Sequence, residues 1–195
     1  MSSTATGAAE GRATGRADGT ALSGPRLRTW RGIAIAIALL GLFLDQIAKD
    51  LAVARLDPAD PPSYFGGLLH LQLLRNSGAA FSMGSGATVV ISLFAIVALV
   101  TVALLVLPRA RHRWSLVSCG MILAGISGNL ADRLFRAPGA LRGHVVDFFA
   151  LPHFAVFNVA DMFITATAVL VVAMSIFGGS ADEDGGSGRS GGARR

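Results

Sequence analysis

The chain has 195 residues, of which 52% are hydrophobic and 15% charged, and its mean hydropathy is +0.58. A soluble domain carries about a quarter charged residues, so this composition argues against a soluble enzyme and against a disordered chain. The net charge of +5 would suit a nucleic-acid-binding protein. However, basic residues that avoid long uncharged apolar stretches are typical of membrane topology signals. A single cysteine excludes a disulfide framework and a Cys-based zinc site.

The apolar stretches predict four membrane-spanning helices, because such a helix needs about 20 mainly apolar residues. The first candidate starts with the uncharged residues 32–44 and reaches a spanning length only if it continues through Asp45 and Lys49. A signal peptide is the alternative for this segment, but a small-x-small cleavage site followed by polar sequence is missing. We therefore expect helices over residues 32–54, 87–107, 114–131 and 159–177.

The placement of Lys and Arg predicts the orientation of these helices. The N-terminal tail has 5 Arg, the link between the second and third helices has 3 and the C-terminal tail has 3, against 6 Lys or Arg on the other side. By the positive-inside rule, both termini lie in the cytoplasm. Segments 45–86 and 132–161 then face outward from the cell membrane.

The composition divides the chain into a membrane domain, residues 30–177, and two cytoplasmic tails, residues 1–29 and 178–195. The tails are rich in Gly, Ala, Ser and Arg and have no apolar periodicity. Both are therefore predicted to be disordered. For the basic N-terminal tail, a tethering or lipid-contact role is the alternative to a plain solvated tail.

Polar residues concentrate in five short stretches that all fall at or near the predicted outer boundary. A carboxylate or amide close to hydrocarbon is costly, so such residues usually face a cavity or a partner. Their convergence on one side of the membrane therefore predicts a functional site there. The stretches are residues 45–49, 76–81, 128–133, 145–148 and 157–161.

Asp45 and Lys49 are four residues apart and share one helix face, with the acid before the base. They form either an interfacial ion pair or the charged wall of an outer cleft. Asn76 begins a run of small residues that is either a tight turn or strand end, or a segment that presents backbone groups to an extended peptide. The preceding residues 68–74 have strand character, which suggests a small outer sheet able to accept a peptide strand.

A second polar helix face is predicted at the outer end of the third helix. Asn129, Asp132 and Arg133 have the spacing i, i+3 and i+4, and Gly128 would let a neighbouring helix approach closely. This face either brackets the helices together or takes part directly in the chemistry.

Two aspartates have opposed surroundings. Asp147 lies between Val-Val and Phe-Phe, and apolar neighbours raise the pKa of a carboxyl group. Asp161 lies three residues after Asn158, which is either a routine helix start or a position that favours a charged carboxylate. Carboxyl groups with such different environments are what an acid–base pair requires.

Other catalytic machinery is missing from the sequence, which contains no P-loop, no H-E-x-x-H and no G-x-S-x-G motif. A metal site from His144, Asp147 and His153 has no recognised spacing, so we expect no metal and no other cofactor. Cys119 is interpreted as a small core residue.

Together, the five polar stretches resemble the lipoprotein signal peptidase family, also called signal peptidase II, over roughly residues 30–177. The matching patterns are D-x-x-x-K, N-x-G-A-A-F, G-N-x-x-D-R, V-V-D-F and F-N-x-A-D. The resemblance implies a mainly α, integral membrane aspartic peptidase with four transmembrane helices and a small extracytoplasmic β-sheet. It also implies that lipid-modified prolipoproteins are the substrates, cleaved just before the diacylglyceryl-cysteine.

Carried over residue by residue, the resemblance implies that Asp147 and Asp161 are the catalytic pair, with Asp132 in reserve. Two carboxyls that share a site cannot both ionise easily, so one would stay protonated and the other would activate water. The supporting or substrate-binding residues are then Asp45, Lys49, Asn76, Gly128, Asn129, Asp132, Arg133 and Asn158.

The partners expected are prolipoproteins and membrane lipids, with no nucleic acid, and the protein is expected to be a monomer. Two other classes of membrane protein fit the sequence less well. A proton-coupled carrier or channel would place its carboxylates near the bilayer midplane, often in repeated halves, whereas these lie at one boundary. A structural membrane scaffold would explain Gly128 and Asn129 but not Asp147 together with Asp161.

Overall fold

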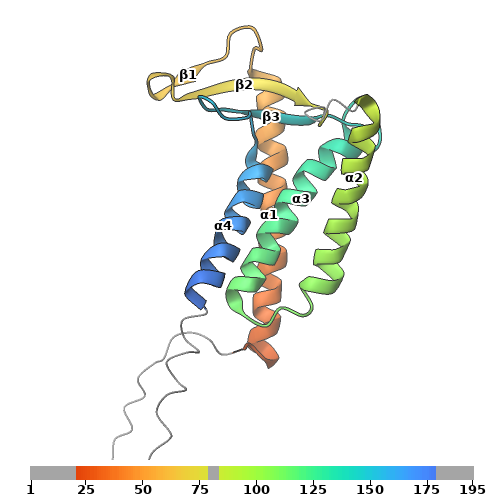
Figure 1. Cartoon of the computed structure of the whole chain (residues 1–195), viewed down its shortest axis with the longest axis vertical. Helices are drawn as coiled ribbons and strands as arrows, with labels where there is room; N and C mark the ends of the chain where they lie inside the picture. The colour runs from red at the N-terminus through yellow and green to blue at the C-terminus, as the bar shows by residue number, and fades with distance from the viewer. Residues whose placement is uncertain (1–20, 79–83, 179–195) are drawn as a thin grey trace, which may run out of the picture.

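The computed structural model describes residues 21–78 and 84–178, with the side chains of residues 84–86 left out. Four helices form a bundle, and a small sheet lies across one end of it (Figure 1). The predicted fold class, a membrane protein with four helices and a small sheet, is confirmed. The elements are α1 (Gly24–Arg55), β1 (Ser63–Tyr64), the 3-10 turn η1 (Phe65–Gly67), β2 (Leu69–Asn76), α2 (Gly84–Thr101), the π-helical turn η3 (Val102–Val106), α3 (Arg113–Phe135), β3 (Val145–Ala150) and α4 (Val159–Gly178).

Helix α1 is longer than the sequence predicts. It begins at Gly24 rather than near residue 32, with Pro25 in its first turn, where the missing N–H of proline is tolerated. Six residues of the predicted N-terminal tail are therefore helical. At 1.5 Å per residue its 32 residues extend about 48 Å, more than the roughly 30 Å of bilayer hydrocarbon. The surplus length carries the C-terminal end of α1 toward the sheet (Figure 1).

Helix α3 packs between the other helices through small residues. A Cβ at Gly120 would lie 2.6 Å from the carbonyl oxygen of Ala34 in α1, and a Cβ at Gly125 would lie 2.7 Å from that of Ala160 in α4. Such close backbone approach is the usual way in which helices associate in lipid, where apolar side chains gain little from leaving the bilayer. The outward faces keep large apolar side chains, for example Phe94, exposed to the surroundings.

The sheet is antiparallel in the order β1-β2-β3. Leu74 pairs with Asp147 and Asn76 pairs with Val145, after a register shift between Leu71 and Leu74. The strand expected over residues 68–74 is thus confirmed as β2. The last residue of β2, Asn76, lies beside β3, the strand that carries Asp147. Asn76 also accepts a hydrogen bond from the backbone N–H of Gly78 (2.8 Å), which starts the following turn at a positive φ of 80°.

Candidate active site

A buried ion cluster joins α1 to α3 at the sheet end of the bundle. The ammonium group of Lys49 lies 2.9 Å from a carboxylate oxygen of Asp45 and 2.9 Å from one of Asp132, and all three side chains are fully buried. Charges removed from water are stable only when they are paired and hydrogen-bonded. The pair predicted on one face of α1 is therefore present, and Asp132 from α3 completes it.

The same two carboxylates also fix the chain next to Asp147 and Asp161. Asp45 accepts a hydrogen bond from the backbone N–H of Ala160 (2.8 Å), in the first turn of α4. Asp132 accepts one from the backbone N–H of Val146 (3.0 Å), in β3. Each bonded N–H belongs to the residue directly before one of the two predicted catalytic aspartates. The ion cluster therefore sets the position of both segments relative to α1 and α3.

Three members of this cluster are missing from the sequence prediction. Arg136 donates to Asp132 (2.6 Å) and to the exposed Asp50 (2.7 Å). Gln46 donates to Asp45 (3.1 Å) and to the carbonyl oxygen of Gly128 (3.1 Å). The spacing of Asp132 and Arg136, four residues apart, is a sequence signal that could have identified this ion pair.

Asp147 is almost entirely buried, with 2% of its surface exposed. Its carboxylate accepts hydrogen bonds from the side-chain amides of Asn76 (2.9 Å) and Asn158 (2.5 Å). Burial raises the pKa of Asp147 above the usual 3.8, and the nearby charge of Asp161 adds to the rise. The two amide hydrogen bonds and the charge of Lys49 lower this pKa, but burial outweighs them. The expectation of a raised pKa at Asp147 agrees with this geometry.

Asp161 is held at the start of α4 by a reciprocal capping arrangement with Asn158. The backbone N–H of Asn158 donates to the Asp161 carboxylate (3.1 Å), and the backbone N–H of Asp161 donates to the amide oxygen of Asn158 (3.1 Å). Asn129 of α3 donates to the other carboxylate oxygen (2.8 Å). The routine helix-start interpretation is therefore correct as far as it goes, and the same contacts also orient Asp161.

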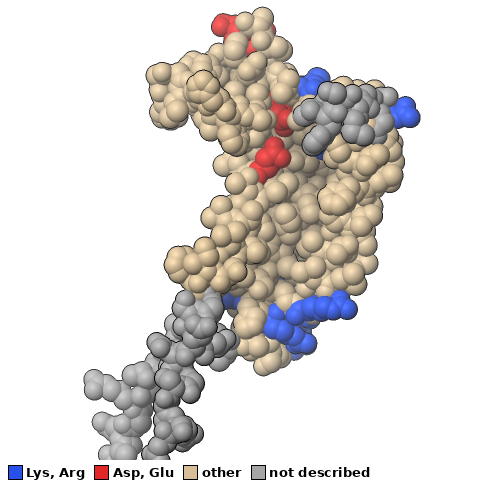
Figure 2. Space-filling model, viewed as in Figure 1, with Lys and Arg blue, Asp and Glu red and all other residues tan. Residues whose placement is uncertain are grey.

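Two asparagines join the aspartates and the ion cluster into one network. The amide nitrogen of Asn158 contacts both Asp147 and the amide oxygen of Asn129 (3.1 Å). That oxygen also accepts a hydrogen bond from Lys49 (3.0 Å). Figure 2 shows acidic side chains at the surface where the sheet overhangs the helices, so part of this region is open to ligands.

Gly128 and Arg133 complete the polar face of α3. A Cβ at Gly128 would lie 2.6 Å from a carboxylate oxygen of Asp45 and 2.9 Å from the Cβ of Ala160, so this position requires glycine. Arg133 is buried, and its charge acts on Asp147, Asp132 and Asp161. Within the described part of the chain its Nε has no hydrogen-bond partner. This N–H is a candidate donor to a substrate carbonyl.

The structure thus brings together all ten residues that the sequence analysis proposes for the site. The other members of the 76–81 motif fall partly outside the described residues, because residues 79–83 are not described. Over residues 21–78 and 84–178, no group of three or more His, Cys, Asp or Glu side chains could hold a metal ion. The arrangement suits chemistry by two carboxyl groups and a water molecule.

Comparison with known proteins points to one family. Residues 37–177 match the family model described as Signal peptidase (SPase) II. The chain is 45% identical over 146 residues to a lipoprotein signal peptidase of Mycolicibacterium smegmatis, covering 75% of this chain but 62% of that protein. It is 46% identical over 144 residues to a lipoprotein signal peptidase of Mycobacterium tuberculosis, covering 74% and 71% of the two chains.

A solved structure is also similar. A bacterial membrane enzyme determined by the in meso method at 1.9 Å resolution aligns with a TM-score of 0.66 at 26% identity. The alignment covers 74% of this chain and 93% of that chain. The architecture described above is therefore shared with an experimentally determined membrane enzyme.

The ion cluster generates a test of stability. Replacing Lys49 by Met leaves Asp45 and Asp132 buried without their shared cation. Breaking a buried ion pair in this way lowers the free energy of unfolding by about 3–5 kcal/mol. We expect a clear fall in the thermal unfolding temperature of the purified protein in detergent. Arg55→Met, at the exposed end of the same helix, is the matched control and should unfold close to the wild-type temperature. Equal unfolding temperatures for Lys49→Met and wild type would contradict the structural role of the cluster.

Proposed function

The chain belongs to the signal peptidase II family, and we propose that it is a membrane aspartic endopeptidase that processes lipid-modified prolipoproteins. In this proposal, the enzyme removes the signal peptide by cleaving just before the diacylglyceryl-cysteine. The observation that carries the proposal is the pair Asp147 and Asp161, which approach from β3 and α4 and are joined through Asn158. We also propose that the mechanism uses no cofactor, that lipid-modified prolipoproteins are the substrates and that the protein is a monomer.

The chemistry follows from two unequal carboxyl groups. The raised pKa of Asp147 supports this residue as the protonated partner. Asp161 is less buried, and its carboxylate accepts N–H hydrogen bonds from Asn129 and from the backbone of Asn158, so it is the carboxylate that removes a proton from water. The resulting water oxygen attacks the scissile carbonyl, whose oxygen is polarised by the proton on Asp147. As the C–N bond breaks, the leaving amine takes up the proton that Asp161 removed from water, and Asp147 keeps its own proton when the carbonyl reforms. Because the two groups interact, their protonation is a property of the pair.

The supporting residues act by position. Asp45 and Asp132, held by Lys49, bind the backbone beside each aspartate. Asn129 and Asn158 bind the carboxylates themselves, and this rigidity keeps the pair in place before substrate arrives. Arg133, buried near both aspartates, is available to a substrate carbonyl oxygen.

The location of the pair suits a lipidated substrate. Asp147 belongs to β3 and Asp161 to the first turn of α4, and Figure 1 shows the sheet lying across this end of the helices, so acyl chains can remain in the bilayer while the peptide lies against the sheet. Those chains hold the scissile bond at a fixed depth, which converts remote binding energy into orientation at the reacting carbonyl. An unlipidated peptide loses this placement.

The first experiment compares Asp147→Asn and Asp161→Asn with wild type in a cleavage assay of a diacylglyceryl-modified precursor. Each change removes half of an acid–base pair, so we expect a loss of several orders of magnitude in turnover. Asp60→Asn, in the exposed segment before β1, is the control and should retain activity. Near-normal turnover of either variant would remove that residue from the pair.

The same assay separates the parts of the proposal. The unlipidated precursor should react far more slowly than the lipidated one, and EDTA should leave the rate unchanged. Inhibition by EDTA that zinc reverses would replace the aspartic mechanism by metal-dependent chemistry. Equal cleavage of both precursors would contradict the lipid anchoring alone.

The pH profile tests the assignment of Asp147 as the proton donor. A donor is active while protonated, so activity should fall as pH rises through the raised pKa of Asp147. The hydrogen bond from Asn76 lowers this pKa. Asn76→Ala should therefore move the falling limb of kcat/KM to higher pH. Gln72→Ala, on an exposed residue of the same strand, should leave the limb in place. If Asn76→Ala moved the rising limb instead, Asp147 would be the carboxylate that activates water and Asp161 the proton donor.

The orientation also belongs to the proposal. Both termini are placed in the cytoplasm and the Asp147–Asp161 site at the outer face of the cell membrane, on the strength of the arginines flanking the helices. Reporter fusions within 108–113 and after Phe177 should read inside, and a fusion at Asp60 should read outside. A cytoplasmic reading at Asp60 would place the aspartates on the side opposite to the one proposed.

A further inference from the structure

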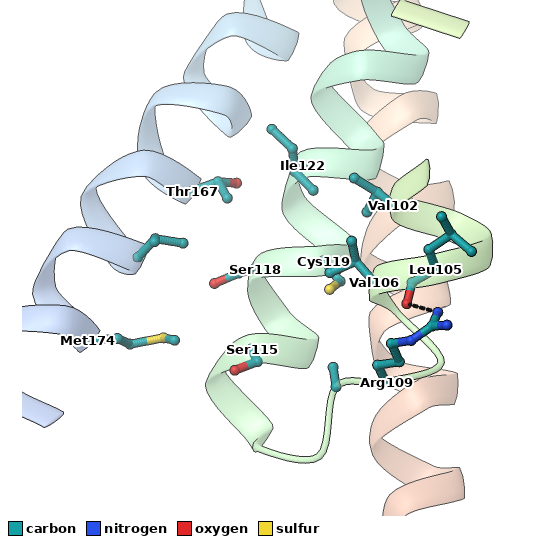
Figure 3. Close-up of a pocket in the computed structure, with 12 residues that line it drawn as sticks. Val102, Leu105, Val106, Arg109, Ser115, Ser118, Cys119, Ile122, Thr167 and Met174 are labelled. Carbon is teal, nitrogen blue, oxygen red and sulfur yellow. Dashed lines mark hydrogen bonds between the residues drawn. The ribbon is translucent and has the colours of Figure 1, made fainter. Parts of the chain in front are cut away.

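A groove lies at the end of the bundle away from the sheet. It has a volume of about 690 Å³ and runs between η3, α3 and α4 (Figure 3). Its walls are mainly aliphatic, with Val102, Leu105, Ile122, Val171 and Met174 among the lining residues. None of the residues proposed for catalysis lines this groove. The groove is therefore separate from the proposed peptidase site.

The polarity of the groove changes in layers along the bundle axis. Figure 3 shows Arg109 and Ser115 toward the end of the bundle, Ser118 and Cys119 further in, and Ile122 with Val102 beyond them. Ser118 is five residues into α3, which begins at Arg113, a depth of about 7.5 Å at 1.5 Å per residue. A cation at the rim, hydroxyls below it and aliphatic walls deeper inside match the phosphate, ester and acyl layers of a phospholipid.

The hydroxyl of Ser118 supports a bound partner. Ser118 is 6% exposed, and its Oγ has no hydrogen-bond partner among the described residues. Helical Ser and Thr usually bond to a carbonyl oxygen about one turn earlier. Ser92 and Thr167 of this chain do so, at 2.7 Å and 2.8 Å. Ser118 lines the groove instead, so its O–H is a donor to an acceptor that residues 21–78 and 84–178 do not provide.

The rim of the groove is positively charged. Arg109 is exposed, and its Nη1 donates to the carbonyl oxygen of Leu105 (2.8 Å), which leaves other N–H groups of the guanidinium for a ligand. Arg31 of α1 donates to the carbonyl oxygen of Pro108 and so lies against the same link. Figure 2 shows Lys or Arg side chains gathered at this end. The aspartates of the described part of the chain belong to the sheet half, from Asp45 onward.

The wall beside Arg109 has an unusual backbone. In η3 the N–H of Leu107 bonds to the carbonyl oxygen of Val102 (2.8 Å), five residues earlier. Such π-helical turns are rare and occur frequently at functional sites. Val102, Leu105 and Val106, all from this turn, line the groove. The turn thus shapes the wall directly below the cationic rim.

We propose that this groove is a binding site for an anionic diacyl phospholipid. One acyl chain lies along the aliphatic walls, an ester oxygen accepts a hydrogen bond from Ser118, and the phosphate lies at Arg109. The charge of the rim selects anionic over zwitterionic lipid, and in the proposed orientation it faces the leaflet where anionic lipids attract basic segments. Lipid binding at this groove does not depend on the proposed peptidase function.

The experiment uses the full chain, purified in detergent and titrated with dioleoyl phosphatidylglycerol or dioleoyl phosphatidylcholine, with bound lipid counted by native mass spectrometry. We expect one phosphatidylglycerol to bind more tightly than phosphatidylcholine. Arg109→Gln should weaken phosphatidylglycerol binding about fivefold, the change expected for loss of one basic side chain near an anionic surface. Arg142→Gln, an exposed arginine at the sheet end, should bind as wild type does. Equal affinities for the two lipids, or equal losses in the two variants, would overturn the proposal.

A second pair of variants tests the groove itself. Val171→Trp fills the space between α3 and α4, whereas Val169→Trp adds the same bulk to an exposed position of α4 outside the groove. Only Val171→Trp should lower phosphatidylglycerol binding. Glycerol phosphate, which has the charge without the chains, should compete weakly. If it competed as well as the lipid, or if both Trp variants bound normally, the acyl chain would not lie in the groove and the proposal would fail.

Discussion

The ammonium group of Lys49 is the contact on which the site-bearing end of the molecule depends. It neutralises two buried carboxylates from different helices, Asp45 and Asp132. Each carboxylate then uses another hydrogen bond to hold a backbone N–H, at Ala160 or at Val146. Without this cation, Asp45 would be buried without an ion-pair partner and Asp132 would keep only Arg136, so the start of α4 and strand β3 would lose the contact that links them. A single lysine thus couples the packing of α1 on α3 to the separation of the two proposed catalytic groups.

Much of this arrangement could be predicted from the sequence because two of its features, long uncharged stretches and clustered polar residues, strongly constrain a membrane protein. Long uncharged stretches require membrane-spanning helices, and α2 and α4 follow those stretches closely. Polar residues next to hydrocarbon tend to converge, which predicted a site formed by the five polar stretches, and the family resemblance supplied the ten residues within them. Helical spacing indicates the pairs within one helix, such as Asp45 with Lys49, but it could not show which residues pair between helices. The link from Lys49 to Asp132 joins positions 83 residues apart, and the contacts of Gln46 with Gly128 depend on the depth at which α1 and α3 meet.

The length of α1 was mispredicted for a related reason. Residues 24–31 carry Arg26, Arg28 and Arg31. When only hydropathy is used to define a membrane-spanning helix, a segment with this much charge is assigned to the tail. In the structure, Leu27 is buried with Ala34 and Leu116, and Arg31 reaches the link after η3. Tertiary contacts therefore extend the helix beyond its apolar centre. The basic residues remain near the bundle end, as the topology rule expects, but on ordered backbone.

The two ends of the bundle carry opposite kinds of polar structure. At the sheet end, carboxylates are buried in a network whose members satisfy one another, which suits a site that must keep one proton in a defined place. At the other end, arginines lie exposed around an aliphatic groove, which suits a ligand that brings its own negative charge. Between these ends, Gly120 and Gly125 of α3 allow close backbone contact with α1 and α4, and this contact sets the spacing of the helices that carry both sites.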